Sequence, residues 1–159
     1  MLTQMGEVTQ MGEELSDKLN KYKSIETPSI LLLSSLFFVT NAARAFFNEH
    51  YLYSFLFSIL TTTSLVVHYN DNIYTNLIDK GAVLSIVIYG GYVTFTNISA
   101  DKWIHCFAIM VTFFLCVYLY VYGFIVNEYC FCEEKCIAQK YHFVMHVISS
   151  IGHHFIIFL

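Results

Sequence analysis

Five long apolar runs, separated by short polar segments, set the pattern of this chain. A helix needs about 20 predominantly apolar residues to cross a bilayer, so each run is long enough for one crossing and too short for two. The pattern therefore predicts an all-α, integral membrane helical bundle of about five transmembrane helices within residues 29–159. The runs cover residues 29–47, 51–69, 76–97, 103–126 and 137–159.

The beginning of the chain differs from the rest in composition. Residues 1–28 contain five acidic residues and three lysines. No apolar run follows a basic start there, so this segment does not have the pattern of a signal peptide. We therefore expect residues 1–28 to form a polar cytosolic tail that precedes the transmembrane domain.

The overall composition agrees with a membrane protein and excludes several other classes. Hydrophobic residues make up 57% of the chain and charged residues 13%, and the mean hydropathy is +0.57. A soluble domain of this length has too little interior for so much apolar side chain, and disordered chains are polar and highly charged. The net charge of −4 offers no basic surface for phosphates, so nucleic acid is excluded as a partner. The lipid bilayer is the expected environment.

The distribution of basic residues predicts how the chain is oriented. Lysine and arginine are more frequent in cytosolic segments than in outer ones. A cytosolic N-terminus with five crossings would leave only Arg44 and Lys102 on the outer side, and we therefore expect Leu159 to face the opposite compartment. The six basic residues on the inner side would be Lys18, Lys21, Lys23, Lys80, Lys135 and Lys140.

Polar residues inside the apolar runs are the candidates for chemistry, because ionisable groups in a membrane are costly and usually functional. Ser64 and His68 are four residues apart, and so are His142 and His146, so each pair shares one helix face. Since successive crossings alternate in direction, both pairs and Asp79 fall near the same membrane face. Three histidines from two helices are a ligand set of catalytic zinc, with the fourth position left for water. The sequence thus predicts a zinc site, and a purely structural role of these residues is the alternative.

The spacing of these residues resembles a motif of the alkaline ceramidases. The resemblance rests on Ser64-Leu-Val-Val-His68, on Asp79 eleven positions later, and on His142-Phe-Val-Met-His146. These enzymes belong to a wider group of seven-helix membrane hydrolases that includes the progestin/adiponectin-type receptors, GPI-remodelling proteins and the haemolysin III proteins. The similar stretches are roughly residues 45–90 and 115–159.

The resemblance implies zinc-dependent hydrolysis of the amide bond of a ceramide-like lipid, which gives a sphingoid base and a fatty acid. It implies that His68, His142 and His146 hold the zinc. Asp79 would then serve the attacking water, and Ser64 would stabilise the tetrahedral oxyanion. The expected location is an internal membrane such as that of the endoplasmic reticulum or the Golgi.

The chain also departs from the pattern of that family. It offers five apolar runs instead of seven helices, and Val144-Met145 stands where the family has two tryptophans. The segment around Glu26 does not reproduce the family's calcium motif, so no calcium site is expected. Two alternatives to a ceramidase therefore stay open. One is a related protein that acts on another lipid or as a receptor or fusion-type protein, and the other is a catalytically inactive membrane scaffold.

Several other residues have simpler expected roles. His105 is expected to pack between helices, and His153 and His154 are expected to line a cavity or to bond to a neighbouring helix. The last helix is expected to turn its ligand face inward, with its lipid-facing residues including Ile148, Phe155 and Ile156.

The cysteines allow several interpretations. Cys106 and Cys116 lie within an apolar run and are expected to pack there. Cys130, Cys132 and Cys136 lie beside the membrane, where palmitoylation, a separate metal site or no special role are all compatible with the sequence. The sequence does not determine the oligomeric state.

Overall fold

The computed structural model describes residues 30–70 and 72–159. Every regular element in this part of the chain is a helix, which confirms the predicted all-α class. The short elements are the 3₁₀ helices Ala100–Lys102 and Tyr129–Phe131 and the π-helical segment Tyr118–Tyr122. The α-helices are α2 (Phe37–Phe47), α3 (Tyr51–Tyr69), α4 (Ile73–Asn97), α5 (Trp103–Val117), α6 (Gly123–Val126) and α7 (Lys135–Ile157).

Within the described residues, four helical stretches are long and apolar enough to cross a membrane. The first continues α2 toward the N-terminus, and the last joins α5, the π-helical segment and α6 into one stretch. At a rise of 1.5 Å per residue, each is at least about 27 Å long, close to the thickness of the hydrocarbon core. The chain is therefore a multi-pass membrane protein, as predicted. The four stretches are Ile30–Phe47, Tyr51–Tyr69, Ile73–Asn97 and Trp103–Val126.

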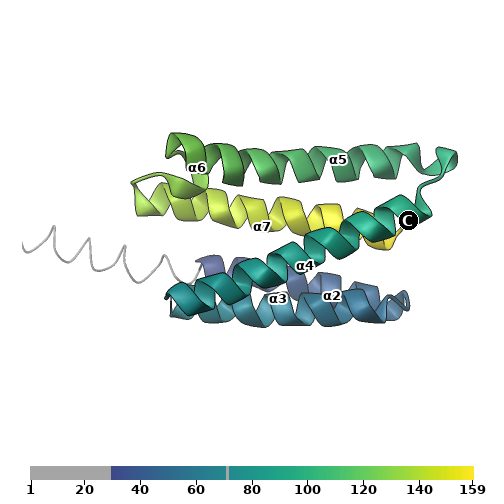
Figure 1. The fold of residues 1–159 in the computed structure, drawn as a ribbon, viewed down its shortest axis with the longest axis horizontal. Helices are drawn as coiled ribbons and strands as arrows, with labels where there is room; N and C mark the ends of the chain where they lie inside the picture. Colours follow the sequence, from purple (N-terminus) through teal and green to yellow (C-terminus); the bar gives the residue numbers. More distant parts are fainter. Residues whose placement is uncertain (1–29, 71) are drawn as a thin grey trace, which may run out of the picture.

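The expected fifth crossing corresponds to α7, which is 23 residues long but less apolar than the other four stretches. It runs beside α5, and its C-terminal end lies at the end of the bundle opposite to Ile30 (Figure 1). Its polar side chains are turned into the protein, since His146, Ser150 and His153 are buried. The length and position of α7 suit a crossing, which stays a prediction.

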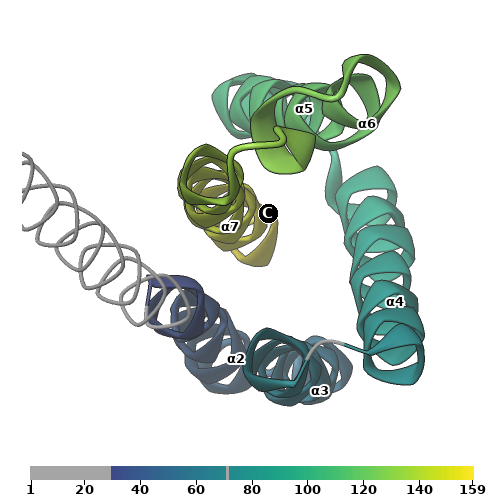
Figure 2. The same cartoon turned by 90° about the vertical axis from the view of Figure 1, so that its left-hand side faces the viewer.

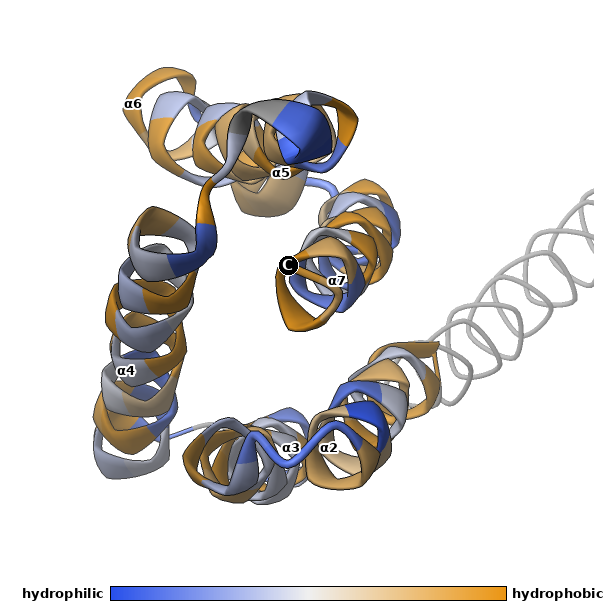
Figure 3. Cartoon of the chain, turned by 90° about the vertical axis from the view of Figure 1, so that its right-hand side faces the viewer, coloured by the Kyte–Doolittle hydropathy of each residue, from blue (hydrophilic) through white to orange (hydrophobic). Residues whose placement is uncertain are grey.

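The helices form an open arrangement in which α7 joins α5 to the row of α2, α3 and α4. Helices α2, α3 and α4 lie side by side in chain order, and α7 packs between α5 and α2 (Figure 2). The polar connection between α2 and α3 lies at the end that faces the viewer in Figure 3. The buried apolar cluster joins α2, α3, α4, α5 and α7, and its members include Phe38, Tyr53, Phe57, Ile86, Ile109 and Ile156.

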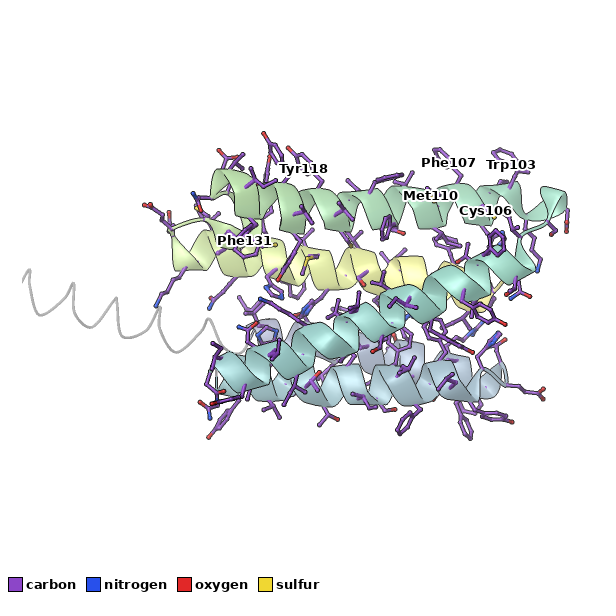
Figure 4. All side chains as sticks on the ribbon, in the orientation of Figure 1. Trp103, Cys106, Phe107, Met110, Tyr118 and Phe131 are labelled. Atoms are coloured by element: carbon purple, nitrogen blue, oxygen red, sulfur yellow. The ribbon has the colours of Figure 1, made fainter. Side chains whose placement is uncertain are left out.

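The outer side of α5 carries large apolar side chains that no other helix of the described residues covers. Trp103 and Phe107 project away from the other helices (Figure 4), and each is about two-thirds exposed, at 65% and 66%. In a bilayer such a surface contacts lipid, because lipid tails are as apolar as these side chains. This face of α5 is therefore assigned to the lipid boundary.

The start of α4 differs from the predicted boundary at residue 76. The helix begins at Ile73, because the side chain of Asn72 accepts hydrogen bonds from the backbone N–H groups of Tyr74 and Thr75, at 2.9 and 3.0 Å. The Thr75 hydroxyl in turn accepts from the Asn72 backbone N–H, which completes a capping box. Capping by polar residues extends the helix beyond its apolar run.

The prediction that Ile156 of α7 faces lipid is wrong. Ile156 is buried, at 6% exposure, whereas Ile148 and Phe155 are half-buried. The absence of a side chain at Gly90 makes this possible, because a Cβ atom there would lie only 3.3 Å from the Cδ1 atom of Ile156. The close approach of α4 to α7 therefore covers a residue that the helix pattern alone assigned to lipid.

Candidate metal centre

Three histidines meet where the last turn of α3 lies beside the first half of α7. His68 lies in the last turn of α3, and His142 and His146 lie one turn apart on α7. The ring centroid of His68 lies 5.2 Å from that of His142 and 5.6 Å from that of His146. The ring centroids of His142 and His146 are 4.7 Å apart. The structure thus brings together the three predicted ligands from residues far apart in the sequence.

The arrangement fits a metal ion. Each histidine offers a ring nitrogen, and these three atoms lie within 4.8 Å of one another. Ligands at the usual Zn–N distance of about 2.0–2.1 Å stand about 3.4 Å apart around a tetrahedral ion, so only small side-chain movements are needed. Among the described residues, no other group of three or more His, Cys, Asp or Glu side chains comes this close together. The three histidines can therefore hold a metal ion.

A serine from the first membrane stretch supports one of these ligands. The Oγ atom of Ser34 lies 2.8 Å from Nδ1 of His146, and the same hydroxyl donates to the backbone carbonyl of Leu31 at 2.9 Å. The ring of Phe38 lies beside the imidazole of His146, with 5.0 Å between centroids. Histidine ligands of metals almost always bond through their other ring nitrogen to a supporting group. Ser34 would occupy that position for His146 with a metal on Nε2.

The expected oxyanion residue, Ser64, is buried at 2% exposure, one helical turn before His68. Its Oγ atom lies 2.8 Å from Oγ of Ser35, and Ser35 donates to the carbonyl of Leu31 at 2.9 Å. Because a serine hydroxyl has one proton and a carbonyl has none, Ser35 uses its proton on Leu31. Ser64 therefore donates to Ser35 in this structure, and it has to turn before it can donate to a substrate.

Asp79 lies on α4, where it accepts a hydrogen bond from the hydroxyl of Thr63 at 2.9 Å. Thr63 precedes Ser64 in α3, so this bond holds Asp79 at the level of the Ser64 turn. Its carboxylate is half-buried and is not part of the group of close ligand atoms. The role of Asp79 toward an attacking water stays a prediction.

Ser34, Ser35 and Thr63 were not among the residues expected from the sequence. The pair Ser34-Ser35 interrupts an apolar run from residue 30 to residue 39, and this interruption was a usable signal. Thr63 gave a weaker one, because it belongs to a run of three threonines whose hydroxyls can bond within their own helix. Only the packing of the helices shows which neighbours these hydroxyls contact.

The other histidines of the apolar runs have partners away from this centre. His153 bonds through Nδ1 to the hydroxyl of Tyr53, which confirms the expected bond to a neighbouring helix. His154 bonds to the hydroxyl of Thr40 at 3.1 Å. The ring of His105 packs edge-on against Phe155, with 5.9 Å between centroids. These residues serve the packing of the bundle.

The cysteines just before and at the start of α7 are not part of a close group of potential metal ligands among the described residues. All five cysteines of the described residues are free thiols, and none belongs to the close group of potential ligands. Burial raises the pKa of the Cys130 thiol to about 11, so this thiol is protonated at neutral pH. The separate metal site at Cys130, Cys132 and Cys136 thus finds no support, and palmitoylation stays a prediction.

Comparison of the chain with models of protein families, with curated proteins and with solved structures finds no match.

Proposed function

We propose that this protein is a zinc-dependent membrane hydrolase that cleaves the amide bond of ceramide-like lipids and gives a sphingoid base and a fatty acid. The observation that carries the proposal is the group of His68, His142 and His146, whose ring nitrogens lie within 4.8 Å of one another. The resemblance of the spaced motif to the alkaline ceramidases supports the choice of reaction.

The donor set favours zinc among the possible metals. Three imidazoles that leave a fourth position open are a common ligand set of catalytic zinc, although copper, iron and nickel also bind imidazole. When bound, zinc supplies Lewis-acid chemistry and lowers the pKa of a water molecule to about 7. His68, His142 and His146 would hold the ion, and the contact between Ser34 and His146 would keep one of these rings in place.

Asp79 and Ser64 have the chemistry that amide hydrolysis needs. The bond from Thr63 to Oδ1 of Asp79 fixes the carboxylate, whose other oxygen can accept a proton from the attacking water. Ser64 can donate its proton to the oxygen of the tetrahedral intermediate after it turns away from Ser35. Ser35 can then turn its own proton toward Ser64 and strengthen that donor.

The position of the histidines within the bundle suits a bond near the lipid headgroup. His142 follows Tyr141, whose ring packs against Tyr129 in the connection before α7, with 5.1 Å between centroids. Tyrosine is enriched at the membrane–water interface, so these two rings mark the depth of the headgroups. The amide of a ceramide-like lipid joins the sphingoid base to the acyl chain just below the membrane surface, which suits this depth.

The remaining features of the proposal concern location. We assign the N-terminus to the cytosol and the protein to an internal membrane, such as that of the endoplasmic reticulum or the Golgi. The bias of basic residues supports the orientation, and the family resemblance supports the membrane.

Purified protein in detergent tests the function directly. Zinc content is measured by elemental analysis, and a fluorescent short-chain ceramide is incubated with the protein with and without a chelator. We expect about one zinc per chain and a release of fatty acid that the chelator abolishes. A matched ester substrate that reacts in place of the amide would identify a hydrolase of another lipid class. Bound zinc without turnover of either lipid would contradict the proposed hydrolase and favour a receptor or scaffold.

A further inference from the structure

The hydroxyl of Ser34 has two contacts, and together they determine where its proton lies. Ser34 is fully buried, at 0% exposure, so water does not compete for its hydrogen bonds. Its Oγ atom is 2.9 Å from the carbonyl oxygen of Leu31 and 2.8 Å from Nδ1 of His146. Both distances are those of hydrogen bonds.

The number of available protons decides the direction of both bonds. A carbonyl oxygen can only accept, so the contact between Ser34 and Leu31 requires the single hydroxyl proton of Ser34. The hydroxyl then offers only lone pairs to His146. A hydrogen bond between these two groups therefore requires a proton on Nδ1 of the imidazole. In a neutral imidazole this leaves Nε2 without a proton and with its lone pair free.

We propose that Ser34 is a positioning residue that holds His146 in the tautomer protonated at Nδ1 and thereby directs the lone pair of Nε2 to the metal. This inference rests on the proposed metal site and adds a residue that the spaced motif does not contain. The hydroxyl of Ser34 contacts Leu31 and His146, so it would act on the metal through His146. The carbonyl of Leu31 contributes to this arrangement, because it accepts the hydrogen bond from the hydroxyl of Ser34.

Neighbouring contacts restrict the ring in the same way. The Phe38 ring lies 5.0 Å from the His146 ring, and Phe38 stands one helical turn after Ser34 on the same face of the first membrane stretch. The imidazole of His146 is itself buried, at 6% exposure. The hydrogen bond at Nδ1 and the neighbouring Phe38 ring together leave the His146 ring little freedom to turn Nε2 away from the proposed metal position.

The test compares Ser34→Ala with Ser150→Ala in the full chain. Ser150 is a matched control, because it is also a buried serine with side-chain bonds between helices, and it lies one turn after His146. Zinc affinity is measured by competition with a chromophoric chelator. Loss of a group that supports a metal ligand typically lowers affinity about 10- to 100-fold. We expect a loss in that range for Ser34→Ala and a change of less than about threefold for Ser150→Ala, since Ser150 supports no ligand.

A second measurement needs neither zinc nor activity. Nitrogen-15 NMR of histidine-labelled, metal-free protein reports the tautomer of each ring, and the His146 signals are assigned by their loss in His146→Ala. We expect the Nδ1-protonated tautomer in the wild type and a shift toward the other tautomer in Ser34→Ala. Far-ultraviolet circular dichroism checks that each variant is as helical as the wild type.

The outcomes separate this inference from the proposed function. A zinc-binding protein that hydrolyses no lipid, but loses affinity in Ser34→Ala, would support the role of Ser34 and contradict the hydrolase. His146 protonated at Nε2 in the metal-free wild type would overturn the inference. An unchanged tautomer together with unchanged zinc affinity in a folded Ser34→Ala protein would overturn it equally.

Discussion

The hydroxyl of Tyr53 and Nδ1 of His153 form a hydrogen bond in the interior of the bundle, between residues 100 positions apart in the chain. Tyr53 comes from α3 and His153 from α7, so the bond links these two helices. The backbone of α4 passes directly beside it at Gly90. Hydrogen bonds of this kind hold membrane helices together, because lipid offers no partner for buried polar groups.

The closeness of Gly90 to this pair predicts the effect of adding a single methyl group. A Cβ atom at Gly90 would lie 2.7 Å from the Tyr53 hydroxyl and 3.4 Å from Cε1 of His153. We expect Gly90→Ala to lower the free energy of unfolding by about 1–3 kcal/mol, the usual range for overpacking. Thermal unfolding in detergent measures it. Gly91→Ala is the matched control, because a Cβ there meets nothing within 4 Å. Equal stability of both variants would contradict the tight contact.

Removing one ligand is expected to remove the metal. In His146→Ala, two imidazoles remain, and zinc should be absent after purification, whereas the wild type should contain about one zinc per chain. His154→Ala serves as the control, because this α7 histidine bonds to Thr40 and is not part of the three-histidine group. Elemental analysis makes the comparison. Unchanged zinc in His146→Ala would show that the metal is held elsewhere.

Asp79→Asn is expected to separate metal binding from chemistry. The amide keeps the size of the side chain but cannot take a proton, so zinc content should stay at the wild-type level. Ceramide hydrolysis should fall by about 10²- to 10⁴-fold, the usual contribution of a general base. Zinc analysis and a fatty-acid release assay on the same preparation measure both. Loss of zinc would make Asp79 a ligand, and full activity would exclude it from the reaction.

The raised pKa of Cys130 predicts slow reaction with thiol reagents. With a pKa of about 11, the thiol of the folded protein becomes thiolate only as the pH rises toward that value. Because the thiolate is the nucleophile, alkylation by iodoacetamide should be slow at pH 8 and should rise about tenfold per pH unit below the pKa. Mass spectrometry of peptides follows it, with denatured protein as the control. Equal rates in folded and denatured protein at pH 8 would contradict the burial.

The number of crossings predicts where the two ends of the chain lie. Five crossings place a tag before Met1 and a tag after Leu159 on opposite sides, whereas four crossings place them on the same side. We expect the first tag in the cytosol, because six basic residues fall on that side and two on the other. Antibody staining before and after selective permeabilisation reads both tags. Tags on the same side would show that α7 does not cross.

The positions of the long helices along the chain were determined largely by the sequence. The apolar run at 51–69 coincides with α3, and the run at 103–126 coincides with the stretch from α5 to α6. Hydropathy predicts such segments because the bilayer demands both apolar side chains and internally satisfied backbone hydrogen bonds. The four-residue spacing within each pair also predicted that Ser64 shares a face with His68, and His142 with His146, since spacing fixes direction within one helix.

Contacts between helices were decided by the tertiary structure. The support of His146 by Ser34, the bond of Ser64 to Ser35 and the burial of Ile156 all depend on which helix lies opposite. Lipid tails and neighbouring helices are both apolar, so a hydrophobic pattern cannot tell one from the other. The small residues and hydroxyl groups that let helices approach have partners only after the bundle has formed. The sequence therefore determined the three candidate ligands, and the packing of the first membrane stretch against α7 determined that Ser34 contacts His146.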